Sequence, residues 1–193
     1  MNKLLCSNTV YVVDYTHFNS VYGNHSTPNG VVIGENKHEL LPSFELRNNN
    51  HIVFEAVNIE NNPGLLKRDD GKLAPQCECF FTAIRHDGGK PWMMFLEMKY
   101  CMPKNLRNNV SEALTQLKNT YRFLCDEKQY VARKSVKPYF VIATPEAESL
   151  APFDDFYLDQ DDMLSIKEEY DGALVFHSNV VEVLTAAHLR QPR

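Results

Sequence analysis

The chain has 193 residues, of which 44% are apolar and 23% are charged, and its formal net charge is −5. This length and composition fit one globular domain with its own core and exclude a disordered chain. No apolar run approaches the roughly 20 residues that span a bilayer, and the N-terminus lacks the apolar stretch of a secretory signal. We therefore expect one cytoplasmic domain over residues 1–193 that makes no membrane contact.

Charge is distributed unevenly along the chain. Residues 85–137 carry eleven Lys and Arg against five Asp and Glu, whereas residues 138–193 carry three against eleven. A basic middle segment can present a positive face to phosphates although the whole chain is acidic. Ordinary solvated faces explain the same distribution, so charge alone leaves a nucleic-acid partner open.

The five cysteines form no repeating disulfide framework, which agrees with an intracellular protein. Cys77, Cys79, His86 and Cys101 are the residues that would have to form a zinc site. Their spacing matches no standard arrangement of zinc ligands, so we do not expect zinc.

The N-terminal quarter of the chain predicts extended structure interrupted by polar connections. Residues 9–15 are β-branched and aromatic and predict a strand. Residues 16–30 predict a loop that ends in an Asn-Gly turn, and residues 31–33 follow it as a short extended piece. Residues 36–47 have a weak amphipathic pattern broken by Pro42 and stay ambiguous.

The central part of the chain predicts three strands, over residues 51–59, 77–85 and 92–101. The turn signal at 86–90 makes the second and third of them a hairpin. Apolar residues on both faces of the third strand indicate that it is buried on both sides.

A helix over residues 110–128 follows, because apolar residues recur there at helical spacing. Asn109 and Glu112 resemble a capping box at its start. The nearly all-apolar residues 138–144 then predict a central strand.

The signal weakens after Pro145. Residues 146–171 are acidic and mixed, and residues 172–177 predict a strand. Residues 180–189 predict either a short helix or a strand, and Asn179 and Glu182, which would cap a helix there, favour the helix. Together the elements indicate the α/β class, with a β-β-β-α-β order and a helix expected before it.

Three charged residues stand inside the otherwise apolar hairpin. Glu97 and Lys99 lie at the end of the third strand and share one face of it, since strand side chains alternate. Glu78 lies at the start of the second strand, and counting from the turn places it opposite Glu97. Burying charge is costly unless it is paired or bound to a metal, and a divalent cation would relieve the repulsion between two facing carboxylates.

An acid, a hairpin, Glu-x-Lys, a helix and a buried strand together resemble the PD-(D/E)xK phosphodiesterase superfamily over about residues 50–144. The resemblance implies a restriction-endonuclease-like αβββαβ core, with a central mixed sheet flanked by helices. It also implies a metal-dependent nuclease in which Glu78 and Glu97 bind Mg²⁺ or Mn²⁺ and Lys99 positions or activates water. Gln116 resembles an accessory helix residue of some family members, which have a Tyr nearby, as Tyr121 is here.

The resemblance further implies a nucleic-acid substrate, either DNA or RNA with DNA favoured, and allows a homodimer that cuts two strands. Candidate contacts to backbone phosphates are Lys104, Arg107, Lys118 and Arg122, which are otherwise surface charges.

The chain departs from the family pattern at its first acid, which is Glu rather than Asp and lies three residues after Pro75. If Glu78 is structural, Asp69, Asp70 or Glu55 would take its place. Glu97 and Lys99 could instead form a structural ion pair at a strand end, with Glu78 paired to another lysine. Two further interpretations stay open. One is a catalytically inactive nuclease-like fold that binds nucleic acid or protein. The other is an unrelated α/β domain whose acidic segment from Asp154 to Asp171 binds a protein.

Overall fold

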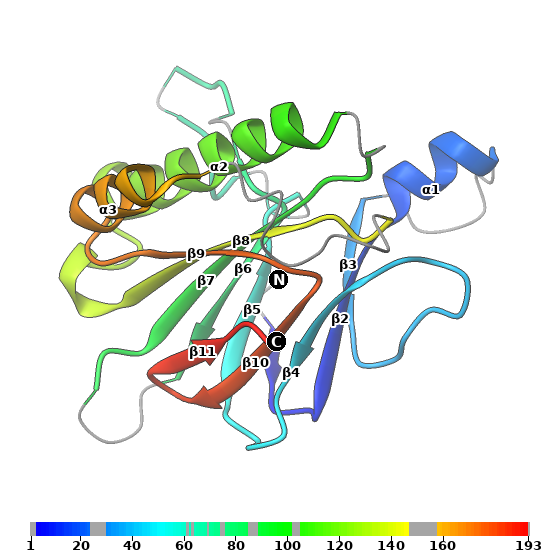
Figure 1. Ribbon diagram of the computed structural model, residues 1–193, viewed down its shortest axis with the longest axis horizontal. Coiled ribbons are helices and arrows are strands. Elements are labelled where there is room, and N and C mark those ends of the chain that lie inside the picture. Colours follow the sequence, from blue (N-terminus) through cyan, green and yellow to red (C-terminus); the bar gives the residue numbers. More distant parts are fainter. Residues whose placement is uncertain are drawn as a thin grey trace.

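The protein has an α/β fold built on two mixed sheets, as a computed structural model shows (Figure 1). The structure describes residues 3–23, 30–60, 62, 64–68, 70–73, 76–84, 89–101, 105–146 and 158–192. The predicted α/β class is therefore correct. Within these ranges no helix is both long and apolar enough to cross a membrane.

The larger sheet contains the hairpin that the sequence predicts. Its strand order is β1-β5-β6-β7-β8-β9, antiparallel from β1 to β7 and parallel from β7 to β9. The strands are β1 (Lys3–Leu5), β5 (Phe54–Asn58), β6 (Cys79–Ala83), β7 (Trp92–Met98), β8 (Lys137–Ala143) and β9 (Leu174–His177). Every residue of β7 is buried, as expected for a strand that is covered on both faces.

The smaller sheet joins the two ends of the chain. Its order is β11-β10-β4-β2-β3, with β10 parallel to β4 and the other pairs antiparallel. The strands are β2 (Thr9–Asp14), β3 (Val31–Gly34), β4 (Phe44–Arg47), β10 (Val180–Thr185) and β11 (His188–Arg190).

The helices are α1 (Tyr15–Tyr22), α2 (Leu106–Arg122) and α3 (Gln160–Glu169). A π-helical turn, Phe123–Glu127, continues α2, and a short 3-10 turn, Arg133–Ser135, precedes β8. One core cluster lies between α2 and the larger sheet, and a second lies between the two sheets. The helices α2 and α3, the larger sheet and the smaller sheet therefore form three layers, and α1 lies apart from the other helices, beside β3 (Figure 1).

The parallel strands β7, β8 and β9 end at one edge of the larger sheet, because the connections through α2 and α3 return the chain to the opposite edge. Met98 is paired with Ala143, and Ile142 with His177. The residues that follow these strand ends therefore meet at this carboxyl edge, which is where α/β sheets bind their ligands.

Two sequence predictions on elements are wrong. Residues 180–189 form the hairpin β10–β11 rather than a helix, and the amide of Asn179 bonds to the backbone of Thr144 instead of capping. The segment expected as a loop after residue 15 begins with α1, which Asp14 caps by accepting a hydrogen bond from Thr16 N.

The central helix begins earlier than predicted. α2 starts at Leu106, so Asn109 lies inside its first turn and donates to the Asn105 carbonyl, and the expected capping box at Asn109 is wrong. The order β5-β6-β7-α2-β8 agrees with the predicted β-β-β-α-β order. The strand β4 immediately precedes it, where a helix was expected.

Candidate active site

The candidate site lies where β7 ends. Glu97 is the last but one residue of β7 and is 3% exposed. Lys99 follows the strand, and its backbone N–H donates to the Ala143 carbonyl at 2.8 Å. This bond fixes the Lys99 backbone against the end of β8 and thereby holds the residue at the carboxyl edge of the sheet.

Lys99 is held by three side chains. Its Nζ lies 3.0 Å from Glu97 Oε1, donates to Gln116 Oε1 at 2.7 Å and lies 3.7 Å from Glu112 Oε1. The Lys99 side chain is 16% exposed, so it is restrained but not completely buried. Such an ammonium is positioned to donate toward an anion that approaches the strand end.

Glu78 stands beside Glu97 across the hairpin. Cys79 is paired with Leu96 and Phe80 with Phe95, so the antiparallel register brings Glu78 opposite Glu97. The Glu78 N–H also donates to the Leu96 carbonyl at 3.2 Å, which ties the start of the strand to β7. The hairpin thus has the pairing predicted from the sequence.

The two carboxylates are unusual because each has a buried oxygen without a hydrogen-bond donor. In the described part of the chain, Glu78 Oε2 and Glu97 Oε2 are among five buried side-chain polar atoms that lack a partner. Buried polar atoms are normally satisfied, so each exception requires an explanation. Two unsatisfied carboxylate oxygens on paired strands fit a shared cation.

Burial raises the pKa of both groups. Burial, followed by the charge of Glu97, raises the pKa of Glu78 well above its ordinary value. Burial also raises the pKa of Glu97 to about 7, although the ammonium of Lys99 opposes this shift. Raised carboxyl pKa values of this kind are frequent at functional sites.

Sequence reasoning missed two acids near Glu78. The negative charges of Asp14, from the end of β2, and of Glu60, from beyond β5, also raise the pKa of Glu78. Each has a structural task, since Asp14 caps α1 and Glu60 Oε2 accepts from Val31 N at 2.9 Å. No local pattern predicts their approach, because they come from different strands than the hairpin. They nevertheless leave the site with more acids than cations.

Gln116 connects Lys99 to the segment that leads into Glu78. Its Oε1 accepts from Lys99, and its Nε2 donates to the Gln76 carbonyl at 3.1 Å. One side chain of α2 therefore positions both arms of the site. Tyr121, which the resemblance associates with Gln116, points elsewhere and donates to Asp171 Oδ2 at 2.9 Å.

Thr120, one turn after Gln116, anchors the same segment and gives a stability prediction. It is fully buried, and its Oγ1 accepts from the Cys77 N–H at 2.8 Å. Thr120→Val preserves the shape but leaves a buried amide unpaired, so we expect a loss of about 1–3 kcal/mol in urea unfolding. Thr115→Val, at an exposed position of α2, is the matched control and should change stability by less than about 0.5 kcal/mol. Equal losses would contradict this role for Thr120.

The alternatives to Glu78 are placed away from the site or lie outside the described residues. Glu55 accepts from the Tyr130 hydroxyl at 3.2 Å, and Asp70 closes a turn by accepting from Lys72 N at 2.9 Å. Asp69 lies outside the described residues.

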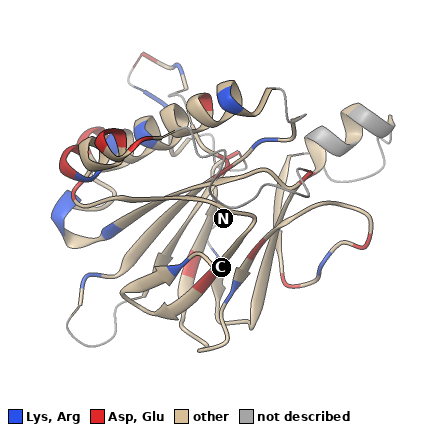
Figure 2. Ribbon diagram, viewed as in Figure 1, with Lys and Arg blue, Asp and Glu red and all other residues tan. Residues whose placement is uncertain are grey.

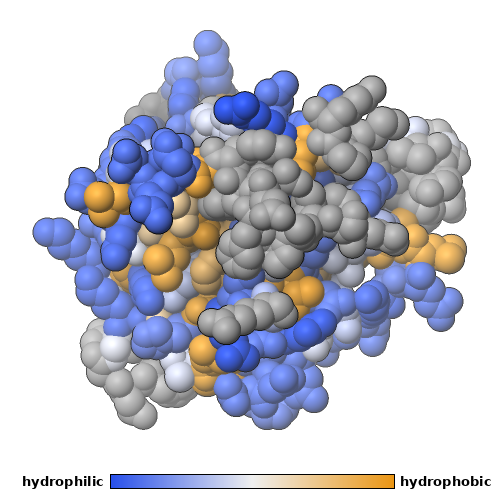
Figure 3. Space-filling model, in the orientation of Figure 1, coloured by the Kyte–Doolittle hydropathy of each residue, from blue (hydrophilic) through white to orange (hydrophobic). Residues whose placement is uncertain are grey.

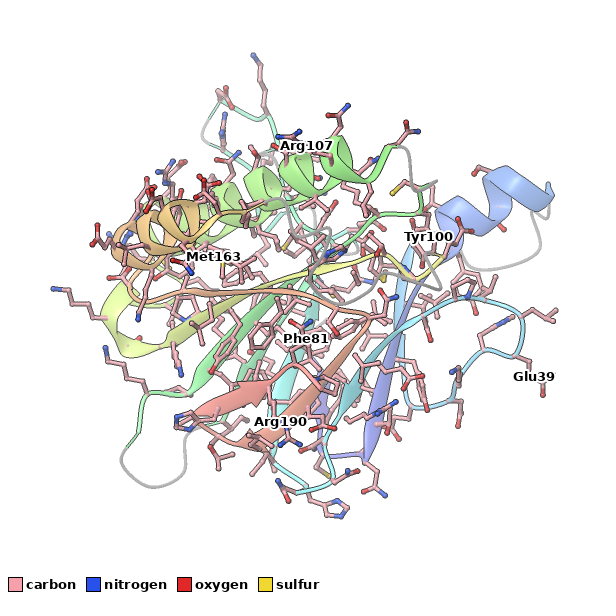
Figure 4. All side chains as sticks on the ribbon, viewed as in Figure 1. Glu39, Phe81, Tyr100, Arg107, Met163 and Arg190 are labelled. Atoms are coloured by element: carbon pink, nitrogen blue, oxygen red, sulfur yellow. The ribbon has the colours of Figure 1, made fainter. Side chains whose placement is uncertain are left out.

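The four residues predicted to contact phosphates do not share one environment in the structure. Lys118 and Arg122 lie over the Tyr170 ring, and Arg122 also forms an ion pair with Glu169. Basic and acidic side chains are interspersed along α2 and α3 rather than separated (Figure 2). Arg107 begins the exposed face of α2, at the end of that helix that is labelled in Figure 4. Lys104 lies outside the described ranges.

The donor set of the site fits a hard divalent cation. Mg²⁺ prefers oxygen ligands and keeps several waters, so two carboxylates suffice to hold it. Over the parts of the chain that are described, no group of three or more His, Cys, Asp or Glu side chains is arranged to hold a metal. The five cysteines are all free. His86, which a zinc site with Cys77, Cys79 and Cys101 would require, lies outside the described residues.

Comparison with known proteins gives no relative, because no protein-family model, curated protein or solved structure matches this chain.

Proposed function

We propose that this chain is a metal-dependent nuclease that hydrolyses phosphodiester bonds, with Glu78, Glu97 and Lys99 as its catalytic residues. The observation that carries the proposal is the pair of buried, unpartnered oxygens, Glu78 Oε2 and Glu97 Oε2, beside an ammonium. A purely structural ion pair would have no need of a second carboxylate with a buried oxygen that lacks a donor.

The fold supports the proposal through connectivity. The meander β5–β6–β7, the crossover through α2 and the parallel strand β8 follow the order of the restriction-endonuclease-like core. Glu78 immediately precedes β6, Glu97 lies on β7 and Lys99 follows β7, and this order resembles that of the PD-(D/E)xK motif. The absence of a helix directly before β5 is a departure from that core.

The side chains present have defined tasks in such a reaction. A bound Mg²⁺ would polarise the phosphate and lower the pKa of a water. Glu78 and Glu97 would hold this ion through oxygens that the protein leaves unpaired. Lys99 would donate to the attacking water or to a phosphate oxygen as negative charge develops. Gln116 keeps the Lys99 ammonium aimed at that position.

The test is an assay of the purified protein on labelled single- and double-stranded DNA and RNA. Cleavage in Mg²⁺ or Mn²⁺ that stops on chelation is expected, with DNA as the better substrate. If all substrates stay intact with either metal while the strands still bind, the protein is an inactive nuclease-like module instead.

A further inference from the structure

A second feature of the carboxyl edge is a pocket of about 510 Å³. It is lined by residues 37–43 and 45 from the β3–β4 connection and β4, by residues 145 and 146 after β8, and by residues 179 and 180 at the start of β10. Its volume lies in the range of small-molecule sites. Neither the sequence motif nor the nuclease chemistry uses these residues.

The pocket adjoins the candidate active site through two strand ends. Tyr100, the residue after Lys99, donates its hydroxyl to the Pro42 carbonyl at 3.3 Å, and Pro42 lines the pocket. On the other side, Ala143 accepts from the Lys99 N–H, and two residues later Pro145 forms the pocket wall. Figure 4 shows Tyr100 near the start of α1 and Glu39 on the outer connection that leads to β4.

The charge of the lining disfavours a phosphate as the occupant. Three acids, Glu39, Glu45 and Glu146, line the pocket together with Lys37 and His38. Glu45 is paired with Lys37 at 2.9 Å and with Arg47 at 3.1 Å. A surplus of carboxylates repels an anion and favours a neutral group that carries N–H donors. Carboxylates accept well from the exocyclic amino group of cytosine.

The remaining walls suit a flat ring. Leu40, Leu41, Pro42, Pro145 and Val180 supply apolar surface, and Leu40 is 80% exposed although it is a large apolar side chain. An apolar area over the β3–β4 connection is visible in Figure 3.

The pocket also contains an unsatisfied polar atom. Ser43 Oγ is buried and has no hydrogen-bond partner, although it lines this space. Because this oxygen is buried, it belongs to the wall of the pocket and is not available to an occupant. Apolar walls and carboxylate acceptors together are the features of a site for a nucleobase.

We propose that this pocket receives one amino-bearing nucleobase of the substrate strand, beside the phosphate held at Lys99. The proposal rests on the proposed nuclease function for the identity of the strand. A base can enter such a pocket only when it is unpaired, so the substrate is single-stranded at this nucleotide.

The experiment compares three short strands of equal length and charge: oligo-dC, oligo-dT and a base-free strand of abasic sites. Binding is measured by fluorescence anisotropy in Ca²⁺, which takes oxygen ligands as Mg²⁺ does. The wild-type protein should bind oligo-dC about tenfold more tightly than the base-free strand, the effect expected for one base contact. Oligo-dT, which lacks the amino group, should bind more weakly than oligo-dC.

Val180→Trp fills the pocket and should bind oligo-dC no more tightly than wild type binds the base-free strand. Leu184→Trp places the same ring on the same strand outside the pocket and should retain the preference. If Val180→Trp misfolds, Glu146→Gln at an exposed position should reduce the preference for oligo-dC over oligo-dT.

Equal wild-type affinity for all three strands would overturn the pocket assignment and leave the nuclease proposal untouched. An unchanged preference in both Val180→Trp and Glu146→Gln would overturn it as well. Conversely, a protein that cleaves nothing but loses its base preference in Val180→Trp would refute the nuclease and support the pocket.

Discussion

Glu97→Ala and Lys99→Ala are each expected to reduce Mg²⁺-dependent cleavage by about 10³-fold, the scale found when one group that stabilises transition-state charge is removed. Glu97 would lose its metal contact, and Lys99 its donation to the reacting phosphate or water. The measurement is the single-turnover cleavage rate at saturating metal.

Two variants make this result specific to the site. Glu97→Gln keeps the volume of the side chain and should lose as much activity as Glu97→Ala. Glu168→Ala removes an exposed acid on α3 and should cleave like wild type. Wild-type rates in Lys99→Ala, with the protein folded, would contradict the assignment of Lys99.

The metal-free protein is expected to lose stability as the pH rises from about 5 to 8. Burial raises the pKa of Glu97 from 4.5 to about 7, so the folded protein keeps a proton that the unfolded chain has released. The contribution of Glu97 to the free energy of unfolding is fully present below the pKa of the unfolded chain. This contribution is lost as the pH rises through the pKa of the folded protein. The shift corresponds to about 3 kcal/mol at most. Glu78, whose pKa is also raised, acts in the same direction.

Urea unfolding at pH 5 and pH 8 in the presence of a chelator measures this effect. Glu97→Gln cannot titrate at this position, so its stability should change less between the two pH values than that of wild type. Added Ca²⁺ should restore wild-type stability at pH 8 and leave Glu97→Gln unaffected. Parallel pH profiles for the two proteins would show that Glu97 does not carry the buried charge.

The hairpin at the site was predictable because its signals are local. The turn signal near residue 88, most of which lies outside the described residues, and the apolar runs on either side of it predicted the register, and the observed register places Glu78 opposite Glu97. The apolar stripe from Val110 to Leu124 likewise predicted α2, although not its first turn. Such patterns are visible in sequence because neighbouring residues create them.

The smaller sheet was not predictable in the same way. Val180 pairs with Glu45 in the parallel contact between β10 and β4, and no local pattern marks a contact so distant in the chain. Asn179 and Glu182 have the spacing of a helix cap, but the side chain of Asn179 accepts a hydrogen bond from the Thr144 N–H instead. Tertiary pairing therefore overrode a local signal that favours a helix.

The helix α1 carried a signal that sequence analysis could have used. Asp14 stands at its N-terminus and accepts from Thr16, and Gly23 ends it with a φ of 63°. A capping acid followed by a closing glycine is typical of a short helix. The approach of Asp14 and Glu60 to Glu78 had no such signal, because it depends on how the two sheets pack.

The central claim is that one divalent cation is shared by Glu78 and Glu97, and a crystal structure with bound Mn²⁺ tests it most directly. An anomalous scattering peak is predicted within bonding distance of Glu78 Oε2 and Glu97 Oε2, with Lys99 Nζ facing the open side of the ion. A crystal in saturating Mn²⁺ without such a peak, in which protein donors satisfy both carboxylates, would contradict the claim.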